Sequence, residues 1–188
     1  MRIRNLVLPL LLAAVLPASA QDVYKIDAVH SQVGFRIRHV VAKVSGRFAK
    51  FEGAIKVDTK DVSKSSVEVT IDAASISTDN DGRDKHLKGP DFFEVEKFPT
   101  ITFKSTAVKE VAKGKLEVTG NLTLKGVTKS VTFPITNAGT HEAKPGKVLA
   151  GFVDGSLKIN RNDYGIKYGP GILGDEVEIT LDVEAGKQ

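Results

Sequence analysis

The chain contains no cysteine among its 188 residues. This absence excludes disulfides, thiol catalysis and cysteine metal ligands, so stability must come from burial and hydrogen bonding. The 27 basic residues form no dense cluster. A nucleic-acid groove needs such clustering, so we predict no nucleic-acid partner. Beyond residue 20 the sequence also has no apolar run long enough to span a membrane.

Motifs for nucleotide binding and nucleophilic catalysis are also missing. The glycine-rich stretch 165–174, which we interpret as a long mobile loop, lacks the Gly-Lys-Ser/Thr ending of a phosphate-binding loop. His30 and Ser31 are adjacent, but no Gly-x-Ser-x-Gly motif accompanies them, and neighbouring residues of a strand point to opposite faces. We therefore predict neither an enzyme nor a cofactor, and expect Asp27 and His30 to secure a strand start by hydrogen bonding.

The first twenty residues have the pattern of a cleaved export signal. Arg2 and Arg4 precede an apolar stretch at 6–16, and Ala18-Ser19-Ala20 has the small-x-small form of a cleavage site. An uncleaved anchor is the alternative, but the apolar stretch is about half the ~20 residues that a spanning helix needs. Removing the two arginines from the 27 basic residues leaves 25 against 23 acidic ones, a net charge near +2. We predict one mature domain over residues 21–188.

Apolar residues alternate with polar ones through most of this domain. Val67, Val69 and Ile71 alternate with charged or polar neighbours, and the same period of two recurs along the chain. Such segments form strands with one apolar and one wet face, as in an antiparallel sheet. Turn signals separate the strands that we expect near 23–27 running into 31–41, then 47–58, 66–73, 99–107, 115–125, 130–137, 147–160 and 175–184.

About eight amphipathic strands without intervening helices favour a closed antiparallel barrel, because closure removes exposed sheet edges. The segment 78–98 breaks the alternation. Its N-cap residues and the stop at Gly89-Pro90 predict a short helix at about 81–88. A second turn from Pro90 would direct Phe92 and Phe93 inward.

Six motifs in chain order resemble the YceI-like family. They are Asp27-Ala-Val-His30-Ser31-x-Val33-x-Phe35 with His39; Gly46-Arg-Phe48 with Phe51 and Gly53; Ser75-Ile-Ser-Thr78-Asp-Asn80 with Arg83-Asp84-x-His86-Leu87-Lys88 and Asp91-Phe92-Phe93; Phe98-Pro99-x-Ile101-x-Phe103-x-Ser105; Gly120-x-Leu122-x-Leu124-x-Gly126-Val127-Thr128; and Asn160-Arg161-x-Asp163-Tyr164-Gly165. Together they cover essentially the whole mature chain. Tyr164 stands where many relatives have phenylalanine.

The resemblance implies an all-β fold, an extended eight-stranded antiparallel lipocalin-like barrel with a short helix packed over one side. It also implies an apolar tunnel for a polyisoprenoid or similar long-chain amphiphile, such as a quinone or prenyl compound, and export to the periplasm. It is compatible with a homodimer. It does not name the lipid, since family members differ in ligand.

The inward strand faces supply the predicted ligand tunnel. Alternation alone fits a packed core as well as a hollow barrel, and the resemblance favours the hollow one. The tunnel residues that we predict are Val33, Phe35, Ile37, Val67, Val69, Ile71, Ile101, Phe103, Val118, Leu122, Phe133 and Ile159.

Polar residues near the barrel ends are candidates for contact with a lipid head group. They are His39, Arg83, His86, Arg161, Asp163 and Tyr164. Each has a structural alternative: His39 as a core histidine bonded to the backbone, Arg83 and His86 as partners that lock the helix, and Arg161 in a structural pair with an aspartate. The spacing of His86 and the nearby aspartates matches no standard zinc or calcium loop, so we predict no metal.

Three hypotheses of function are therefore compatible with the sequence. A lipid carrier or store is favoured. An enzyme acting on a bound lipid would need a role for His39, His86, Asp84 or Asp163. A stress-protective partner of an envelope protein would have an interior filled by its own side chains.

Overall fold

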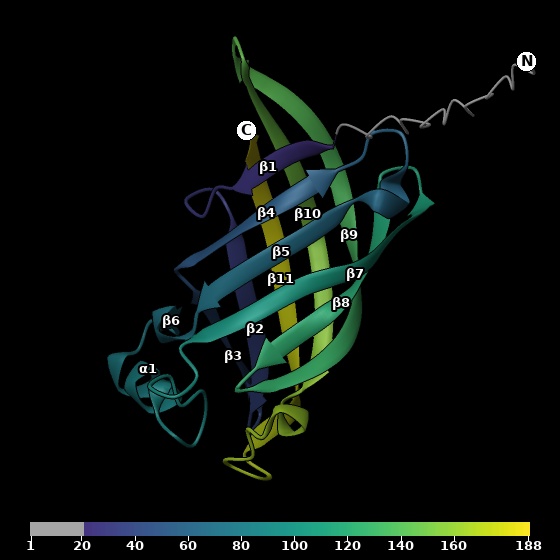
Figure 1. The fold of residues 1–188 in the computed structure, drawn as a ribbon. Helices are drawn as coiled ribbons and strands as arrows, with labels where there is room; N and C mark the ends of the chain where they lie inside the picture. The colour runs from purple at the N-terminus through teal and green to yellow at the C-terminus, as the bar shows by residue number, and fades with distance from the viewer. Residues whose placement is uncertain (1–20) are drawn as a thin grey trace, which may run out of the picture.

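The computed structural model describes residues 21–188, so the predicted export signal lies outside the described residues. A single antiparallel sheet dominates this part of the chain (Figure 1). Its strands are β1 (Asp22–Ile26), β2 (Gln32–His39), β3 (Ala42–Phe48), β4 (Phe51–Val57), β5 (Ser66–Asp72), β6 (Ile76–Ser77), β7 (Thr100–Ala112), β8 (Lys115–Leu124), β9 (Val127–Lys144), β10 (Lys147–Asn160) and β11 (Leu173–Lys187).

Eight of these strands close into the predicted barrel. The hydrogen-bonded order is β1-β4-β5-β7-β8-β9-β10-β11, and β11 pairs back with β1. All pairings are antiparallel. The closed ring leaves these strands no unpaired edge, as the amphipathic pattern led us to expect.

The strand predicted to run from 23 into 41 is in fact two strands. β1 pairs with the last residues of β11, and β2 pairs with its first two thirds. Between them the chain turns a corner, where the Ser31 hydroxyl accepts from the Glu184 N–H at 2.9 Å and donates to the Glu184 carbonyl at 3.1 Å. The Asp27 N–H also donates to that carbonyl, at 2.9 Å. These bonds stop β1 and divert the chain into β2.

β3 was not predicted as a separate strand. It forms a hairpin with β2, and its far end pairs with the short β6, so the three strands extend the sheet beyond β11. The inward side of β3 carries Val44 and Phe48, with Gly46 between them. A Cβ on Gly46 would lie 2.4 Å from the Phe35 ring, which fills the space instead. The predicted strand over 31–41 ran across the β2–β3 turn because Val40 and Val41 are residues typical of strands.

The predicted turns are confirmed. Gly114, Gly126 and Gly146 each follow a strand end and have φ of +70°, +74° and +77°. Glycine adopts this left-handed conformation at little steric cost.

The predicted helix is also confirmed, as α1 (Asp81–Lys88). The Asn80 side chain accepts from the Arg83 N–H, which satisfies one of the free donors at the helix start. After Gly89 the chain turns again and buries Phe92, while Phe93 packs against the barrel core. The α1 segment lies beside β6 at one end of the barrel (Figure 1). We call this the α1 end.

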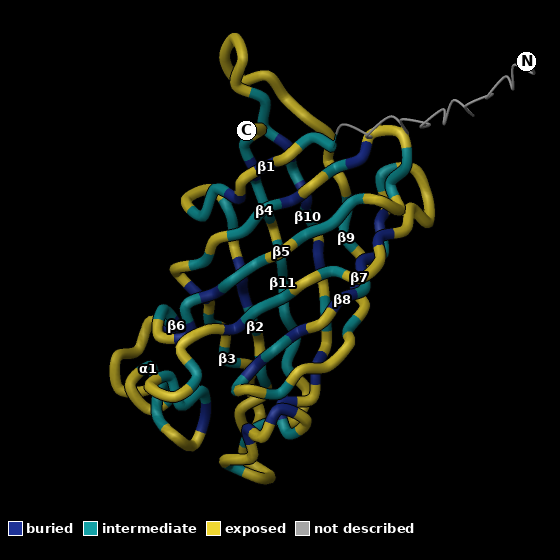
Figure 2. Tube along the Cα trace, viewed as in Figure 1, coloured by how far each residue is buried: buried dark blue, intermediate teal, exposed yellow. Residues whose placement is uncertain are grey.

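Burial follows the period of two along the strands (Figure 2). In β8 the residues Leu116, Val118, Gly120, Leu122 and Leu124 are all buried, and those between them are not. The buried side chains form two clusters stacked along the barrel, one toward the α1 end and one toward the other end. Within residues 21–188 every buried side-chain nitrogen and oxygen has a hydrogen-bond partner.

Candidate functional site

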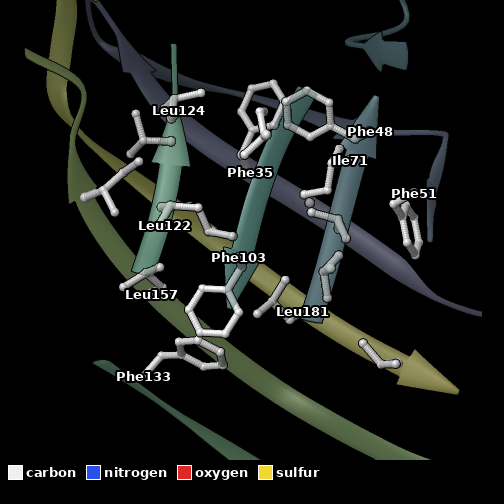
Figure 3. A pocket seen from close by; sticks show the side chains of 18 of the residues that line it. Phe35, Phe48, Phe51, Ile71, Phe103, Leu122, Leu124, Phe133, Leu157 and Leu181 are labelled. Atoms are coloured by element: carbon white, nitrogen blue, oxygen red, sulfur yellow. The ribbon is translucent and has the colours of Figure 1, made fainter. Parts of the chain in front are cut away.

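The two clusters surround a cavity of about 660 Å³ inside the barrel. This volume lies within the ~300–1,000 Å³ typical of small-molecule sites. Figure 3 shows aromatic and aliphatic side chains from several strands turned toward it, among them Phe103, Phe133 and Leu157. The interior is therefore hollow along part of its length, an outcome that alternation alone could not predict.

All twelve predicted tunnel residues line this cavity: Val33, Phe35, Ile37, Val67, Val69, Ile71, Ile101, Phe103, Val118, Leu122, Phe133 and Ile159. Their contact with a ligand stays a prediction. The lining also includes Leu124, Leu157, Ile179 and Leu181, which were not among the predicted residues. The same alternation rule would have found them, because each lies at an inward position of its strand.

The middle of the cavity is where the two clusters meet. Phe51, Val69, Phe103, Leu157 and Leu181 pack against both of them. The Phe103 and Phe133 rings lie 5.5 Å apart at a tilt of 58°, a favourable aromatic arrangement. We call the five residues that pack against both clusters the waist of the cavity. None of the five is charged, so the waist suits the apolar part of a ligand.

The two ends of the lining carry the polar groups. Away from the α1 end these are Ser65, Ser66, Glu110 and Asn137. At the α1 end they are His39, Thr78, Arg83, His86 and Arg161, together with Tyr168. The cavity therefore has cationic and imidazole groups at one end only.

Arg83 and His86 have structural partners in addition to their place on the lining. Arg83 donates from Nε to the Thr78 hydroxyl at 2.7 Å and from Nη2 to the Thr78 carbonyl at 2.8 Å. His86 Nε2 lies 2.8 Å from an Asp91 carboxylate oxygen. Both side chains thus help to lock the α1 segment, as the structural alternative predicted, while facing the cavity.

Tyr168 joins His86 and Phe92 in an aromatic cluster that sequence reasoning missed. Its ring lies 4.9 Å from the imidazole and 5.2 Å from the Phe92 ring. These contacts connect the 165–172 segment to the α1 segment across the cavity end. Sequence offered no signal for them because the partners are about eighty residues apart and lie outside regular strands.

His39 is exposed at the cavity end, so the alternative of a core histidine is wrong. It shares the inward-facing side of β2 with Phe35 and Ile37, as predicted, but β2 ends at His39, beyond the packed interior.

Arg161 is 3% exposed and is held almost entirely by main-chain carbonyls. Its Nε donates to Gly174 at 2.9 Å, and its Nη1 donates to Ile166 at 2.9 Å and Tyr168 at 2.7 Å. Its Nη2 lies 3.4 Å from Asp175. The expected aspartate pair is present, but the carbonyl bonds are shorter and more numerous. They tie the stretch 165–174 to the barrel at Ile166, Tyr168 and Gly174, and the mobility of this loop stays a prediction.

Asp163 and Tyr164 do not line the cavity, which corrects their prediction as head-group contacts. A short 3-10 turn at Arg161–Tyr164 ends the strand alternation on which that prediction depended. It leaves Asp163 exposed and places Tyr164 in the packed core, 2% exposed. Burial, and to a lesser extent the charge of Asp163, raises the pKa of the Tyr164 phenol.

Asp27 and His30 hydrogen-bond as predicted, with His30 Nδ1 2.9 Å from Asp27 Oδ2. Glu184 lies near both, and ligand atoms of the three side chains fall within 4.8 Å of one another. The hydrogen bond to Asp27 raises the pKa of His30 above 6.5, and the same bond lowers the pKa of Asp27 below 3.8. The pair holds the β1–β2 corner, far from the cationic end of the cavity.

Replacing His30 by glutamine should lower the melting temperature in a pH-dependent way. A raised folded pKa makes His30 stabilising below about pH 6.5, and this contribution is lost as the pH rises through the folded pKa. The lowered pKa of Asp27 makes its contribution present above about pH 3.8 and lost in stronger acid. The melting-temperature difference, measured across pH, should therefore be largest between about pH 4 and 6.5 and vanish near pH 9. An equal difference at every pH would contradict this.

Comparison with known proteins identifies the family of this barrel. The YceI-like domain matches residues 24–185, nearly the whole described chain. The chain belongs to the YceI-like family. A UPF0312 protein from Pseudomonas aeruginosa PAO1 is 43% identical over 175 residues, covering 91% of this chain and 90% of the relative. Protein YceI from Salmonella newport is 40% identical over 168 residues, covering 88% and 87%.

Several solved structures have the same fold. Burkholderia cenocepacia BcnA superposes with a TM-score of 0.78 at 30% identity, covering 85% of this chain and 99% of that protein. The YceI protein of Campylobacter jejuni gives 0.73 at 31% identity, covering 79% and 87%. A polyisoprenoid-binding domain from Saccharophagus degradans gives 0.65 at 17% identity, covering 88% and 98%, which supports the fold alone. Across residues 21–188 we find no helix with the length and apolar character needed to cross a membrane.

Proposed function

We propose that this YceI-like protein binds a long-chain isoprenoid or similar amphiphilic lipid, such as a quinone or prenyl compound, in its barrel cavity. The observation that carries the proposal is the hollow apolar waist with polar groups at the ends. Each CH₂ buried there is worth roughly 0.8 kcal/mol, so about ten carbons supply ~8 kcal/mol before the costs of association. No specific polar partner is needed along the chain.

The head group is best matched to the α1 end. Arg83, His86 and His39 lie on the lining there and can offer hydrogen-bond donors to a carbonyl, hydroxyl or phosphate oxygen. Arg161 has most of its donors bonded to carbonyls, so we assign it the role of holding the 165–174 segment. The name of the Saccharophagus degradans domain, which describes polyisoprenoid binding, agrees with this choice of ligand class.

We propose storage, sequestration or transport in the periplasm rather than catalysis. Export rests on the pattern of residues 1–20. The hydroxyl of Ser31 both donates to and accepts from the Glu184 main chain, and His30 Nδ1 is engaged by Asp27. These bonds leave the adjacent His30 and Ser31 without the geometry of a nucleophile and its base.

Native mass spectrometry of the protein purified from its own periplasm, followed by lipid extraction, tests the proposal. We expect one co-purifying isoprenoid per protomer, and uptake of a quinone or prenyl alcohol by the delipidated protein. Recovery of unprocessed chain from the cytoplasm would contradict export. A lipid-free protein that takes up neither compound on titration would overturn the binding role.

A further inference from the structure

The turn between β2 and β3 is built from residues that such turns normally avoid. His39 pairs with Ala42, so the loop has only two residues, Val40 and Val41. Two-residue hairpin loops favour asparagine, aspartate and glycine. Val40 has φ of +52°, which is an outlier for a β-branched residue. The side chains are 51% and 95% exposed, so burial does not offset this strain.

This turn lies beside the cavity end. The Val40 N–H donates to the Ile172 carbonyl at 2.8 Å. Ile172 and Tyr168 are 52% and 48% exposed, and both also line the cavity. We name Val40, Val41, Tyr168 and Ile172 the mouth patch.

Exposed apolar residues elsewhere do not gather in this way. Among the described residues the other large ones are Val23, Val29 and Val111, on β1, the β1–β2 corner and β7. None of the three lines the cavity. Single exposed apolar residues are common on soluble proteins, whereas a cluster at the opening of an apolar cavity indicates a contact surface.

Basic side chains flank the mouth patch. Arg38 and Lys43 lie directly opposite each other in the β2–β3 ladder, a like-charge pairing that disfavours the hairpin. Lys43 forms an ion pair with Glu178 at 3.3 Å, and Arg38 donates to the Val40 carbonyl at 2.8 Å. Lys167 is exposed next to Tyr168. Exposed apolar side chains next to basic ones match the composition of a lipid bilayer, which has apolar chains beneath anionic phosphates.

We propose that the mouth patch docks on a lipid bilayer and that the ligand passes between the bilayer and the cavity during this contact. The inference rests on the proposed lipid-binding function. Release through water would expose the whole apolar chain, with a barrier that grows with every methylene. Insertion of Val40 and Val41 brings the cavity opening to the apolar layer, while Arg38 and Lys167 meet the lipid phosphates. Four apolar side chains give weak, reversible docking, as exchange requires.

Transfer of a fluorescent prenyl alcohol to vesicles of phosphatidylethanolamine and phosphatidylglycerol tests this docking. Contact-dependent transfer should speed up in proportion to vesicle concentration. Val41→Asp should slow it on the order of tenfold, the effect of losing one buried valine, without changing affinity for the probe. Val111→Asp, an exposed valine on the β7–β8 hairpin, is the matched control and should transfer as the wild type does.

Val40→Gly separates docking from stability. Glycine fits the positive φ, so the melting temperature should rise by about 2–4 °C while transfer slows, because the apolar side chain is lost. Co-flotation of the ligand-free protein with the same vesicles should also weaken in both mouth variants. A transfer rate independent of vesicle concentration, or equal flotation of Val41→Asp and wild type, would overturn the docking.

The outcomes also distinguish this inference from the proposed function. Absence of probe binding overturns the lipid-binding role, and flotation of the ligand-free protein still decides whether the patch docks. Intact probe binding with no vesicle dependence overturns the docking alone. If Val41→Asp instead abolishes a dimer in analytical ultracentrifugation, the patch is an interface between two copies and the bilayer assignment is wrong.

Discussion

Replacing Arg161 by methionine should lower the free energy of unfolding by about 3 kcal/mol, because three carbonyls lose their donor at roughly 1 kcal/mol or more each. The carbonyls belong to Ile166, Tyr168 and Gly174. For a domain of this size the loss corresponds to a fall in melting temperature of about 6–12 °C. Urea unfolding measures the first quantity and calorimetry the second.

The same variant should loosen the cavity end. Without the guanidinium, Tyr168 loses the bond that positions its ring against His86 and Phe92. Hydrogen exchange should accelerate at residues 165–173 and stay unchanged in β8. Arg161→Lys keeps the charge but replaces the planar fork by one ammonium, so we expect an intermediate loss. A methionine variant within about 0.5 kcal/mol of the wild type would show that the carbonyls rebond to water.

Filling the waist of the cavity should abolish binding of long chains. Leu157 lies on β10 between the two clusters and faces the interior (Figure 3). Tryptophan at this position adds volume where the barrel is hollow and should block the path along the axis. Excluding about five carbons removes roughly 4 kcal/mol, so Kd for a long prenyl probe should rise at least about 100-fold. Fluorescence titration of the delipidated protein measures this.

Lys158→Trp is the matched control for this substitution. Lys158 is the next residue of β10 and points to the outer face, where it pairs with Glu176 at 2.9 Å. Losing an exposed ion pair costs little, so both stability and probe affinity should stay near those of the wild type. A short prenyl probe should still bind the Leu157→Trp variant in one half of the cavity. Equal affinity of both variants for the long probe would place the ligand outside the barrel.

Much of the barrel could be predicted because its determinants are local. Alternation at Val67, Val69 and Ile71 assigns an inward face without any knowledge of the partner strands, since strand side chains point to opposite faces in turn. Glycines with positive φ mark turns for an equally local reason. The α1 helix was predicted because its Asn80 cap lies at its own end.

β3 and Arg161 could not be predicted in the same way. The strand β3 was merged with its neighbours because the turn before it consists of Val40 and Val41, which are typical of strands, and because Gly46 interrupts its apolar side between Val44 and Phe48. The sequence left two roles open for Arg161, a contact with a head group or a structural pair with an aspartate. Its actual partners are main-chain carbonyls, which every residue carries and no sequence pattern reveals. Asp163 and Tyr164 were misplaced because a 3-10 turn ended the alternation at that point.

The sequence by itself determined which residues face inward, where the chain turns and to which family it belongs. It could not determine that the interior is hollow, because packed and open barrels alternate identically. Only the tertiary structure decided that inward side chains such as Phe103 and Leu157 leave a cavity inside the barrel, and that Val40 and Val41 lie beside its opening. Both facts depend on distances between strands far apart in the chain, which local residue patterns do not encode.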